Sequence, residues 1–239
     1  MTLKTICISA LVFYPHSSFA RVVTSNSVKI SVISQSNTSN YATNFDLNEN
    51  PISENGHWHK NQSNVFTKVQ TANGIAFGTN GIANTYDDSY ALLSGFGPNQ
   101  TIEAVIYRDL SFQPNGITHE AELLLRFSDD AENAWGYECT FSYYGGMAVA
   151  SWDGPMGSFT ILNSTSKYSG YYGQEFKTGD VVKATITGNV ITTYVNNVPM
   201  LEVIDSRHAT GQPGIGFFIR PGGHNNMIGF SSLKVTSGN

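Results

Sequence analysis

The chain has 239 residues, of which only 13% are charged, and a formal net charge of −5 at pH 7. Ordinary domains carry about 25% charged residues, so uncharged polar and aromatic side chains fill more of this surface than usual. The acidic balance lacks the electrostatic footprint of a nucleic-acid-binding protein, and it makes anionic lipid an equally poor partner. Neutral ligands such as sugars suit this kind of surface.

The first 20 residues have the pattern of a secretory signal peptide. Lys4 supplies the positive start, and an apolar run of about ten residues, TICISALVFY, follows it. Ser18 and Ala20 then provide the small residues for cleavage before Arg21. A buried N-terminal strand is the alternative. No later stretch approaches the roughly 20 apolar residues of a membrane helix, so we predict a secreted or extracytoplasmic protein without a membrane partner.

The rest of the chain has the pattern of one all-β domain. Short β-rich runs separated by turn residues recur to the C-terminus, and none shows three turns of helical spacing. Many short strands without alternating helices predict a two-sheet antiparallel sandwich. We therefore expect residues 21–44 to be an N-terminal strand or linker, and residues 45–239 to form a single β-sandwich domain.

The segment HEAELLLRF, His119–Phe127, contains the first candidate site residues. As a strand it has two faces, one with Glu120, Glu122, Leu124 and Arg126, and the other with Ala121, Leu123, Leu125 and Phe127. The second face is apolar and predicts the core, so the first should face water or a groove. Glutamates two apart lie about 6.6 Å apart along a strand, which is compatible with the roughly 5–9.5 Å between the carboxyl groups of glycosidases.

The same face could instead bind a sugar without chemistry. Carboxylates accept hydrogen bonds from hydroxyl groups, a guanidinium donates them, and aromatic rings stack on a pyranose. Tyr144 and Trp152 lie on the next two predicted strands and could line the same concave sheet. The third interpretation is a solvated face in which Arg126 pairs with a neighbouring strand.

The other unusual residues are assigned to the core or to turns. Cys7 lies in the leader, which leaves Cys139 alone as a small buried side chain. Trp58 is expected to anchor the core, and its flanking His57 and His59 lack a third ligand for zinc. No cofactor is predicted, although two oxygen-rich loops could bind calcium if they are not simple solvated turns. These loops contain Asp87 with Asp88, and Asp129 with Asp130 and Glu132.

The segment GDVVKATITGNVITTYVNNVPMLEVID predicts a meander of three antiparallel strands. Val182, Ala184 and Ile186 alternate with polar residues, as in a half-buried strand. Gly188-Asn189 and Asn196-Asn197 then provide two turns suited to positive φ.

From Gly179 to Phe218 this region resembles the back half of laminin-G-type domains of the concanavalin A-like lectin/glucanase superfamily. A Gly-Asp opener leads into a strand, a hairpin and the strand TYVNN, and GQPGIGFF is similar to the G-x-PGIGF turn and strand of that family. The resemblance implies a jelly roll whose concave sheet often binds sugar. Lectins, glycosidases, lyases and inert adhesion modules share this fold, so the resemblance implies less about function.

Retaining glucanases of this superfamily carry three acidic residues on one strand as E-x-D-x-E. Counted from Glu120, the third position is Leu124, and counted from Thr118, the first position is not acidic. We therefore predict a secreted carbohydrate-binding domain that recognises a polysaccharide or other glycan through Glu120, Glu122, Arg126, Tyr144 and Trp152. A glycoside hydrolase or polysaccharide lyase using Glu120 or Glu122, and a non-catalytic adhesion module that binds protein, are the alternatives.

Overall fold

The structure is a computed structural model that describes residues 38–60, 66–79, 88–111, 119–155, 157–165, 175–219 and 225–238. The predicted signal peptide and residues 21–37 of the expected N-terminal strand or linker lie outside these residues. So does Asp87, one of the two acids in the first candidate calcium loop.

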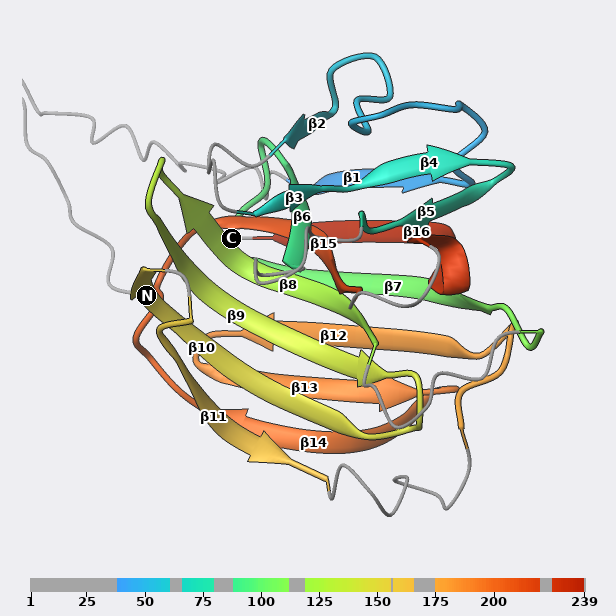
Figure 1. The fold of residues 1–239 in the computed structure, drawn as a ribbon. Coiled ribbons are helices and arrows are strands. Elements are labelled where there is room, and N and C mark those ends of the chain that lie inside the picture. Colours follow the sequence, from blue (N-terminus) through green and yellow to red (C-terminus); the bar gives the residue numbers. More distant parts are fainter. Residues whose placement is uncertain are drawn as a thin grey trace, which may run out of the picture. The chain divides into compact units, whose positions relative to one another are not determined.

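The strands form two sheets that pack face to face (Figure 1). The strands of the first, the β7 sheet, are β1 Ser39–Thr43, β4 Gln70–Ala72, β5 Ile75–Phe77, β7 Asn99–Arg108, β12 Val181–Thr187, β13 Val190–Val195, β14 Val198–Ile204 and β16 Ile228–Gly238. Their order is β14-β13-β12-β7-β16-β5-β4, and β1 also pairs with β16.

The second sheet, the β8 sheet, carries the candidate site. Its strands are β2 Trp58–Lys60, β3 Thr67–Lys68, β6 Asp88–Leu93, β8 Glu120–Asp129, β9 Asn133–Ser142, β10 Met147–Pro155, β11 Phe159–Ser164 and β15 Gln212–Phe218. Their order is β11-β10-β9-β8-β15-β6-β2, all antiparallel, and the short β3 pairs with β6 in parallel. The prediction of an all-β, two-sheet antiparallel jelly-roll sandwich is confirmed.

Helical structure is limited to one short turn in the part of the chain that the structure describes. This 3₁₀ turn is η1, Asn225–Met227, and it directly precedes β16. Within the same residues, no helix is long and apolar enough to cross a membrane.

Alternating apolar residues of the two sheets form the core between them. Leu123 and Leu125 of β8, with Cys139 of β9, are fully buried there, as the sequence predicted. Tyr137 of β9 is buried beside them. The β7 sheet contributes residues such as Ile102 to the same core. Trp58 is also buried in it, with 3% exposure, which confirms the prediction of a core anchor.

The predicted meander is confirmed by the pairing of β12, β13 and β14. β12 pairs with β13 on either side of Gly188, whose φ is +60°. β13 pairs with β14 across Asn196 and Asn197, which have φ values of +49° and +66°. Asparagine tolerates this left-handed region better than most residues, so the turn chemistry agrees with the observed backbone.

The sandwich includes residues that precede the expected domain start at 45. β1 pairs with the C-terminal strand β16, with Ser39 opposite Ser237 and Thr43 opposite Leu233. Its sequence, SNYAT, has an exposed or half-exposed side chain at each position. A strand without a buried face carries no apolar alternation, so this signal was weak in the sequence.

Cys139 provides a direct test of the strand register. Its side chain is fully buried, and burial followed by the negative charge of Glu138 raises the pKa of its thiol. In a Cys7→Ser background, we expect a thiol reagent to label Cys139 slowly in the native state and rapidly in denaturant. Rapid labelling of the native protein would contradict the placement of Cys139 between the sheets.

Candidate functional site

A β-bulge changes the face on which the second half of β8 presents its side chains. The pairing of β8 with β9 shifts register between Leu125 and Ser128, and Arg126 has a φ of +48°. Because a bulge inserts an extra residue into one strand, the alternation of faces is reset after it. Phe127 therefore lies on the outer face of the β8 sheet, and its predicted place between the sheets is wrong.

Arg126 points away from the predicted site. Its guanidinium donates hydrogen bonds to the carbonyl oxygens of Pro98 at 2.7 Å, Gly188 at 2.7 Å and His208 at 3.0 Å. Pro98 and Gly188 flank strands of the β7 sheet, so the side chain links the two sheets at one end of the sandwich. The predicted position of Arg126 beside the glutamates is wrong, and the bulge is the physical reason.

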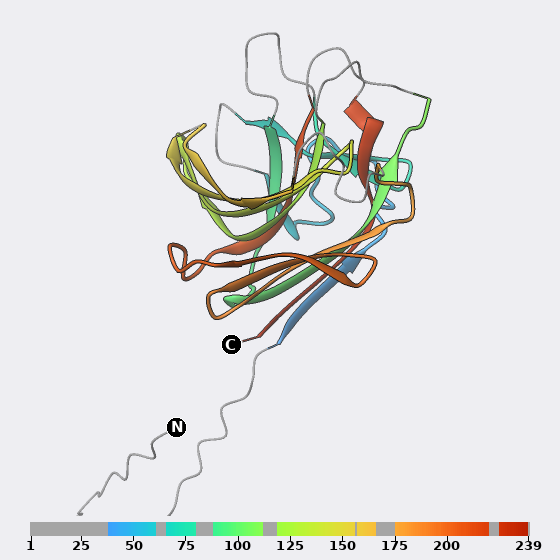
Figure 2. The ribbon, with the colours of Figure 1, turned by 90° about the horizontal axis from the view of Figure 1, so that it is seen from below.

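The outer face of the β8 sheet carries a second apolar cluster, separate from the core. In Figure 2 strands β8 to β10 bow toward the other sheet, which makes this outer face concave. The outer-face cluster consists of Phe66, Tyr90, Leu92, Leu124, Phe127, Ala134 and Trp152. Its rings meet edge to face, with centroids 5.6 Å apart for Phe66 and Trp152 and 5.3 Å apart for Tyr90 and Phe127.

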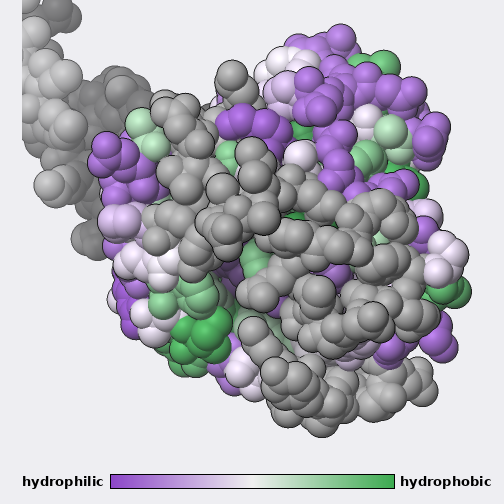
Figure 3. All heavy atoms as spheres, in the orientation of Figure 1, coloured by the Kyte–Doolittle hydropathy of each residue, from purple (hydrophilic) through white to green (hydrophobic). Residues whose placement is uncertain are grey.

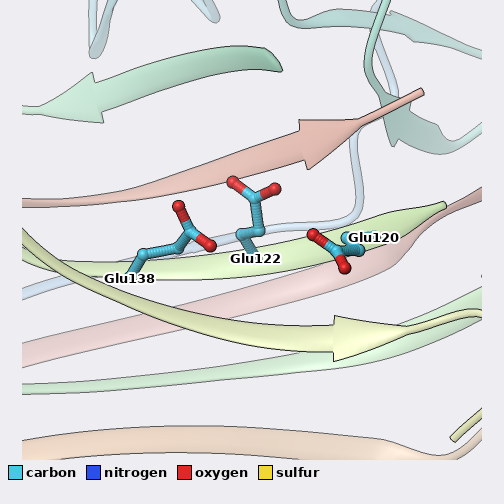
Figure 4. Close-up of side chains that lie close together, drawn as sticks. All are labelled: Glu120, Glu122 and Glu138. Carbon is cyan, nitrogen blue, oxygen red and sulfur yellow. The ribbon is translucent and has the colours of Figure 1, made fainter. Parts of the chain in front are cut away.

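Three glutamates stand together beside this cluster. Glu122 of β8 is opposite Thr140 of β9, and Leu124 is opposite Glu138, so Glu138 is a diagonal neighbour of Glu122. Figure 4 shows the carboxyl groups of Glu120, Glu122 and Glu138 side by side, with Glu122 in the middle. One carboxylate oxygen from each of these three residues, here called the acid cluster, lies within 4.8 Å of the other two.

The three carboxyl groups have different environments. Glu122 is buried, with 4% exposure, and its Oε1 has no hydrogen-bond partner among the described residues. Burial raises the pKa of this carboxyl well above its ordinary value, and the negative charges of Glu138, Asp88 and Glu120 raise it further. Glu120 and Glu138 are half-buried.

Hydrogen bonds fix Glu138 in place. It accepts one from the indole Nε1 of Trp152 at 2.6 Å and another from the Thr140 hydroxyl at 2.7 Å. Sequence reasoning missed Glu138, although its position next to buried Cys139 placed it on the outer face. The sequence alone did not show that β8 pairs with β9, and this pairing brings Glu138 next to Glu122.

A glycine makes room for the buried carboxyl. Gly216 of β15 pairs with Glu122, and a Cβ added there would lie 2.3 Å from Glu122 Oε2. No real Cβ approaches another heavy atom so closely. A residue with a side chain at position 216 would therefore have to push the Glu122 carboxyl aside.

The other two predicted contact residues have different outcomes. Trp152 is part of the outer-face cluster and touches the acid cluster through Glu138. It also packs against Phe159 of β11, whose ring centroid is 5.3 Å away. Tyr144 lies in the turn between β9 and β10, where it packs against Tyr143 and the core between the sheets. The structure thus brings Glu120, Glu122 and Trp152 together and leaves Tyr144 off the strand face.

An open groove lies at the end of β8 that contains Phe127, Ser128 and Asp129. Its apolar lining residues are Leu92 and Phe127 of the outer-face cluster and the edge of the core residue Trp58. Its polar lining consists of His59, Ser94, Ser128, Asp129 and Gln212 with the backbone of Gly211. A narrow pocket next to it is lined by Glu122, Glu138, Tyr90 and Trp152, and Phe127 borders both. The Tyr90 hydroxyl of the narrow pocket donates a hydrogen bond to Asp129 Oδ2 of the groove at 2.8 Å, which connects the pocket with the groove.

Apolar surface is exposed at the β11 edge of this sheet. Phe159 and Ile161 have 45% and 47% exposure. Figure 3 shows an apolar patch where β11 runs in Figure 1. Phe159 pairs with Trp152, so the outer-face cluster reaches solvent at this edge.

The second candidate calcium loop forms a tight turn between β8 and β9. Asp130 Oδ1 accepts hydrogen bonds from the backbone N–H groups of Glu132 and Asn133, both at 2.8 Å. These bonds lower the pKa of the Asp130 carboxyl, as expected for a charged acceptor. Asp130 thus serves as a turn-capping residue, which agrees with the solvated-turn interpretation.

No protein-family model matches the chain, and no curated protein matches it in sequence. Among solved structures, it is similar to the CBM2 module of the Lactobacillus casei BL23 phage J-1 evolved Dit, with a TM-score of 0.55, 8% identity, and coverage of 85% of this chain and 97% of that chain. It is also similar to porphyranase B from Zobellia galactanivorans, with a TM-score of 0.53, 9% identity, and coverage of 84% and 94%. A third similar structure is the Emp46p carbohydrate recognition domain, with a TM-score of 0.52, 12% identity, and coverage of 75% of this chain and 87% of that chain.

At such low identities the likeness shows the fold alone. The fold is the concanavalin A-like jelly roll that the resemblance of residues 179–218 implied.

Proposed function

We propose that this protein binds a polysaccharide or other glycan in the groove on the concave outer face of the β8 sheet. The observation that carries the proposal is the lining of the groove, which combines the apolar outer-face residues Leu92 and Phe127 with several polar residues. Sugar rings present both apolar faces and hydroxyl edges, and sites with a few placed polar groups on an apolar surface bind such ligands. By their names, two of the fold neighbours are a CBM2 module and a carbohydrate recognition domain.

The groove is a better place for the glycan than the buried glutamate. Glu122 has 4% exposure, so a ligand could reach it only through the narrow pocket. His59, Ser94 and Ser128 are exposed in the groove and can exchange hydrogen bonds with hydroxyl groups. The predicted leader in residues 1–20 supports placing this binding outside the cytoplasm.

Asp129 and Asp130 form a matched pair for the test. Asp129 lines the groove, whereas its neighbour Asp130 caps the turn. We expect Asp129→Asn to weaken binding about tenfold or more, because a hydrogen bond to a charged group contributes about 1.5–3 kcal/mol and about 1.4 kcal/mol is a factor of ten. Asp130→Asn should bind as the wild type does.

The measurement is affinity electrophoresis on soluble glucans, mannans, galactans and fructans, followed by calorimetry with whichever is retained. Failure of the wild type to bind any of them, or equal loss in both variants, would contradict the proposal. Binding of a protein in place of these glycans would favour the adhesion module.

A second candidate function is glycoside hydrolysis by the acid cluster. The carboxylate oxygens lie within 4.8 Å of one another, near the roughly 5–5.5 Å between the carboxyl groups of retaining enzymes. The raised pKa of Glu122 favours the protonated form that a general acid needs, and Glu138 is fixed as an acceptor. Release of reducing ends by the wild type, abolished in Glu138→Gln, would establish this function.

A further inference from the structure

We propose that the acid cluster of Glu120, Glu122 and Glu138 binds a calcium ion. The cluster offers three carboxylate oxygens that lie within 4.8 Å of one another. A second, independent observation points to a ligand. Glu122 is 96% buried, stands between the other two carboxyl groups, and has an Oε1 without a hydrogen-bond partner in the described part of the chain.

The spacing suits calcium as it stands. Calcium binds oxygen at about 2.3–2.6 Å, so two oxygens on one ion are at most about 5.2 Å apart. The oxygens of the acid cluster lie within 4.8 Å of one another, so every pair of them meets this requirement. Magnesium, at about 2.0–2.1 Å, would need every pair of oxygens within about 4.2 Å, and it also demands a stricter octahedral geometry.

The chemistry of the donors also favours calcium. All three are carboxylates, and hard oxygen donors select calcium or magnesium over metals that prefer nitrogen or sulfur. A buried carboxylate without a partner is costly, and neighbouring carboxylates of the same charge add to this cost. A divalent cation would give Glu122 Oε1 its partner and offset the repulsion among the three groups.

Residues around the cluster hold the ligands in position. The Trp152 indole and the Thr140 hydroxyl orient Glu138 by hydrogen bonds. Gly216 leaves space for the Glu122 carboxyl on the neighbouring strand. Such outer partners typically change metal affinity by about 10–100-fold when they are removed.

This site goes beyond the proposed glycan binding, which uses the neighbouring groove and does not require the cation. It competes with the hydrolase alternative, because a carboxylate bound to calcium cannot deliver a proton as a general acid. The two uses of the acid cluster are therefore distinguishable.

Terbium, which replaces calcium at oxygen sites, is the probe for the test. The full-length chain is freed of metal with a chelator and titrated with terbium while its tryptophans are excited. Because the Trp152 indole donates a hydrogen bond to Glu138, we expect it to sensitise the luminescence of bound terbium. The luminescence should saturate at one equivalent of terbium and be lost on addition of calcium. Trp152→Phe should lose most of this luminescence and still bind calcium in calorimetry.

Two matched charge removals locate the site. Glu122→Gln should weaken terbium and calcium binding by about tenfold or more, whereas Glu132→Gln, which removes the same charge from the exposed β8–β9 turn, should leave both unchanged. Gly216→Ala should also weaken binding, since the added methyl group displaces the Glu122 carboxyl without removing a charge. Circular dichroism checks that each variant is folded, and Glu120→Gln replaces Glu122→Gln if the latter does not fold.

The proposal is overturned if calcium does not reverse the luminescence, or if the folded acid-cluster variant and Glu132→Gln bind terbium equally.

Discussion

Replacing Arg126 with alanine should lower the free energy of unfolding by about 3–5 kcal/mol. Its buried guanidinium donates hydrogen bonds to three backbone carbonyl groups, at Pro98, Gly188 and His208. Each such charge-assisted bond contributes about 1.5–3 kcal/mol, and their effects overlap because one side chain makes all three. Alanine would leave these carbonyl groups facing a cavity at the end of the sandwich.

Two further variants separate geometry from charge. Arg126→Lys keeps the charge but lacks the planar fork that reaches several acceptors, so we expect an intermediate loss. Arg207→Ala is the exposed control, since its side chain is 43% exposed and pairs with Asp153 and Asp205 at 3.4 and 3.3 Å. Exposed ion pairs contribute about 0–1 kcal/mol. Urea unfolding measures the free energy of unfolding of all three variants. If Arg126→Ala and Arg207→Ala lose similar amounts of it, Arg126 does not link the two sheets as described.

The bulge at Arg126 depends on two distant glycines. A Cβ at Gly211 would lie 2.2 Å from the Arg126 carbonyl carbon and oxygen, and one at Gly136 would lie 2.8 Å from the same oxygen. Both glycines have positive φ values, +145° and +137°. Alternation along HEAELLLRF could not reveal the bulge, because these glycines lie in other strands or loops.

Features set by neighbouring residues in the chain were predictable. The burial of Leu123, Leu125 and Cys139 follows from alternation, which needs no knowledge of the pairing partner. The turns at Gly188 and at Asn196-Asn197 follow from local backbone preferences.

Features set by pairing between distant segments were not predictable in this way. Glu138 joins Glu122 only through the register of β8 against β9. The groove is assembled from residues near 58, 93, 128 and 212, which belong to or adjoin four different strands. A single sequence does not fix which strands become neighbours, so the candidate glutamates could be named while most of the groove could not.

Leu125→Ala should lower the free energy of unfolding by about 2–5 kcal/mol, near the upper end of this range. Leu125 is fully buried between the sheets, where the core contains Tyr137 and Cys139. Backbone strands on both sides limit how far the core can close around the missing side chain. A cavity that does not collapse makes such a substitution more costly.

Leu124→Ala is its matched partner, with a different expected result. Leu124 has 1% exposure, yet it belongs to the outer-face cluster and lines the narrow pocket beside Glu122. Water and neighbouring side chains can enter the space that the Leu124 side chain leaves. We therefore expect Leu124→Ala to lower the free energy of unfolding by about 2 kcal/mol or less. Because Trp152 is in the same cluster, its fluorescence should change in Leu124→Ala more than in Leu125→Ala. If urea unfolding shows equal losses of unfolding free energy for the two variants, the outer-face cluster is packed as densely as the core. There would then be no open pocket beside the glutamates.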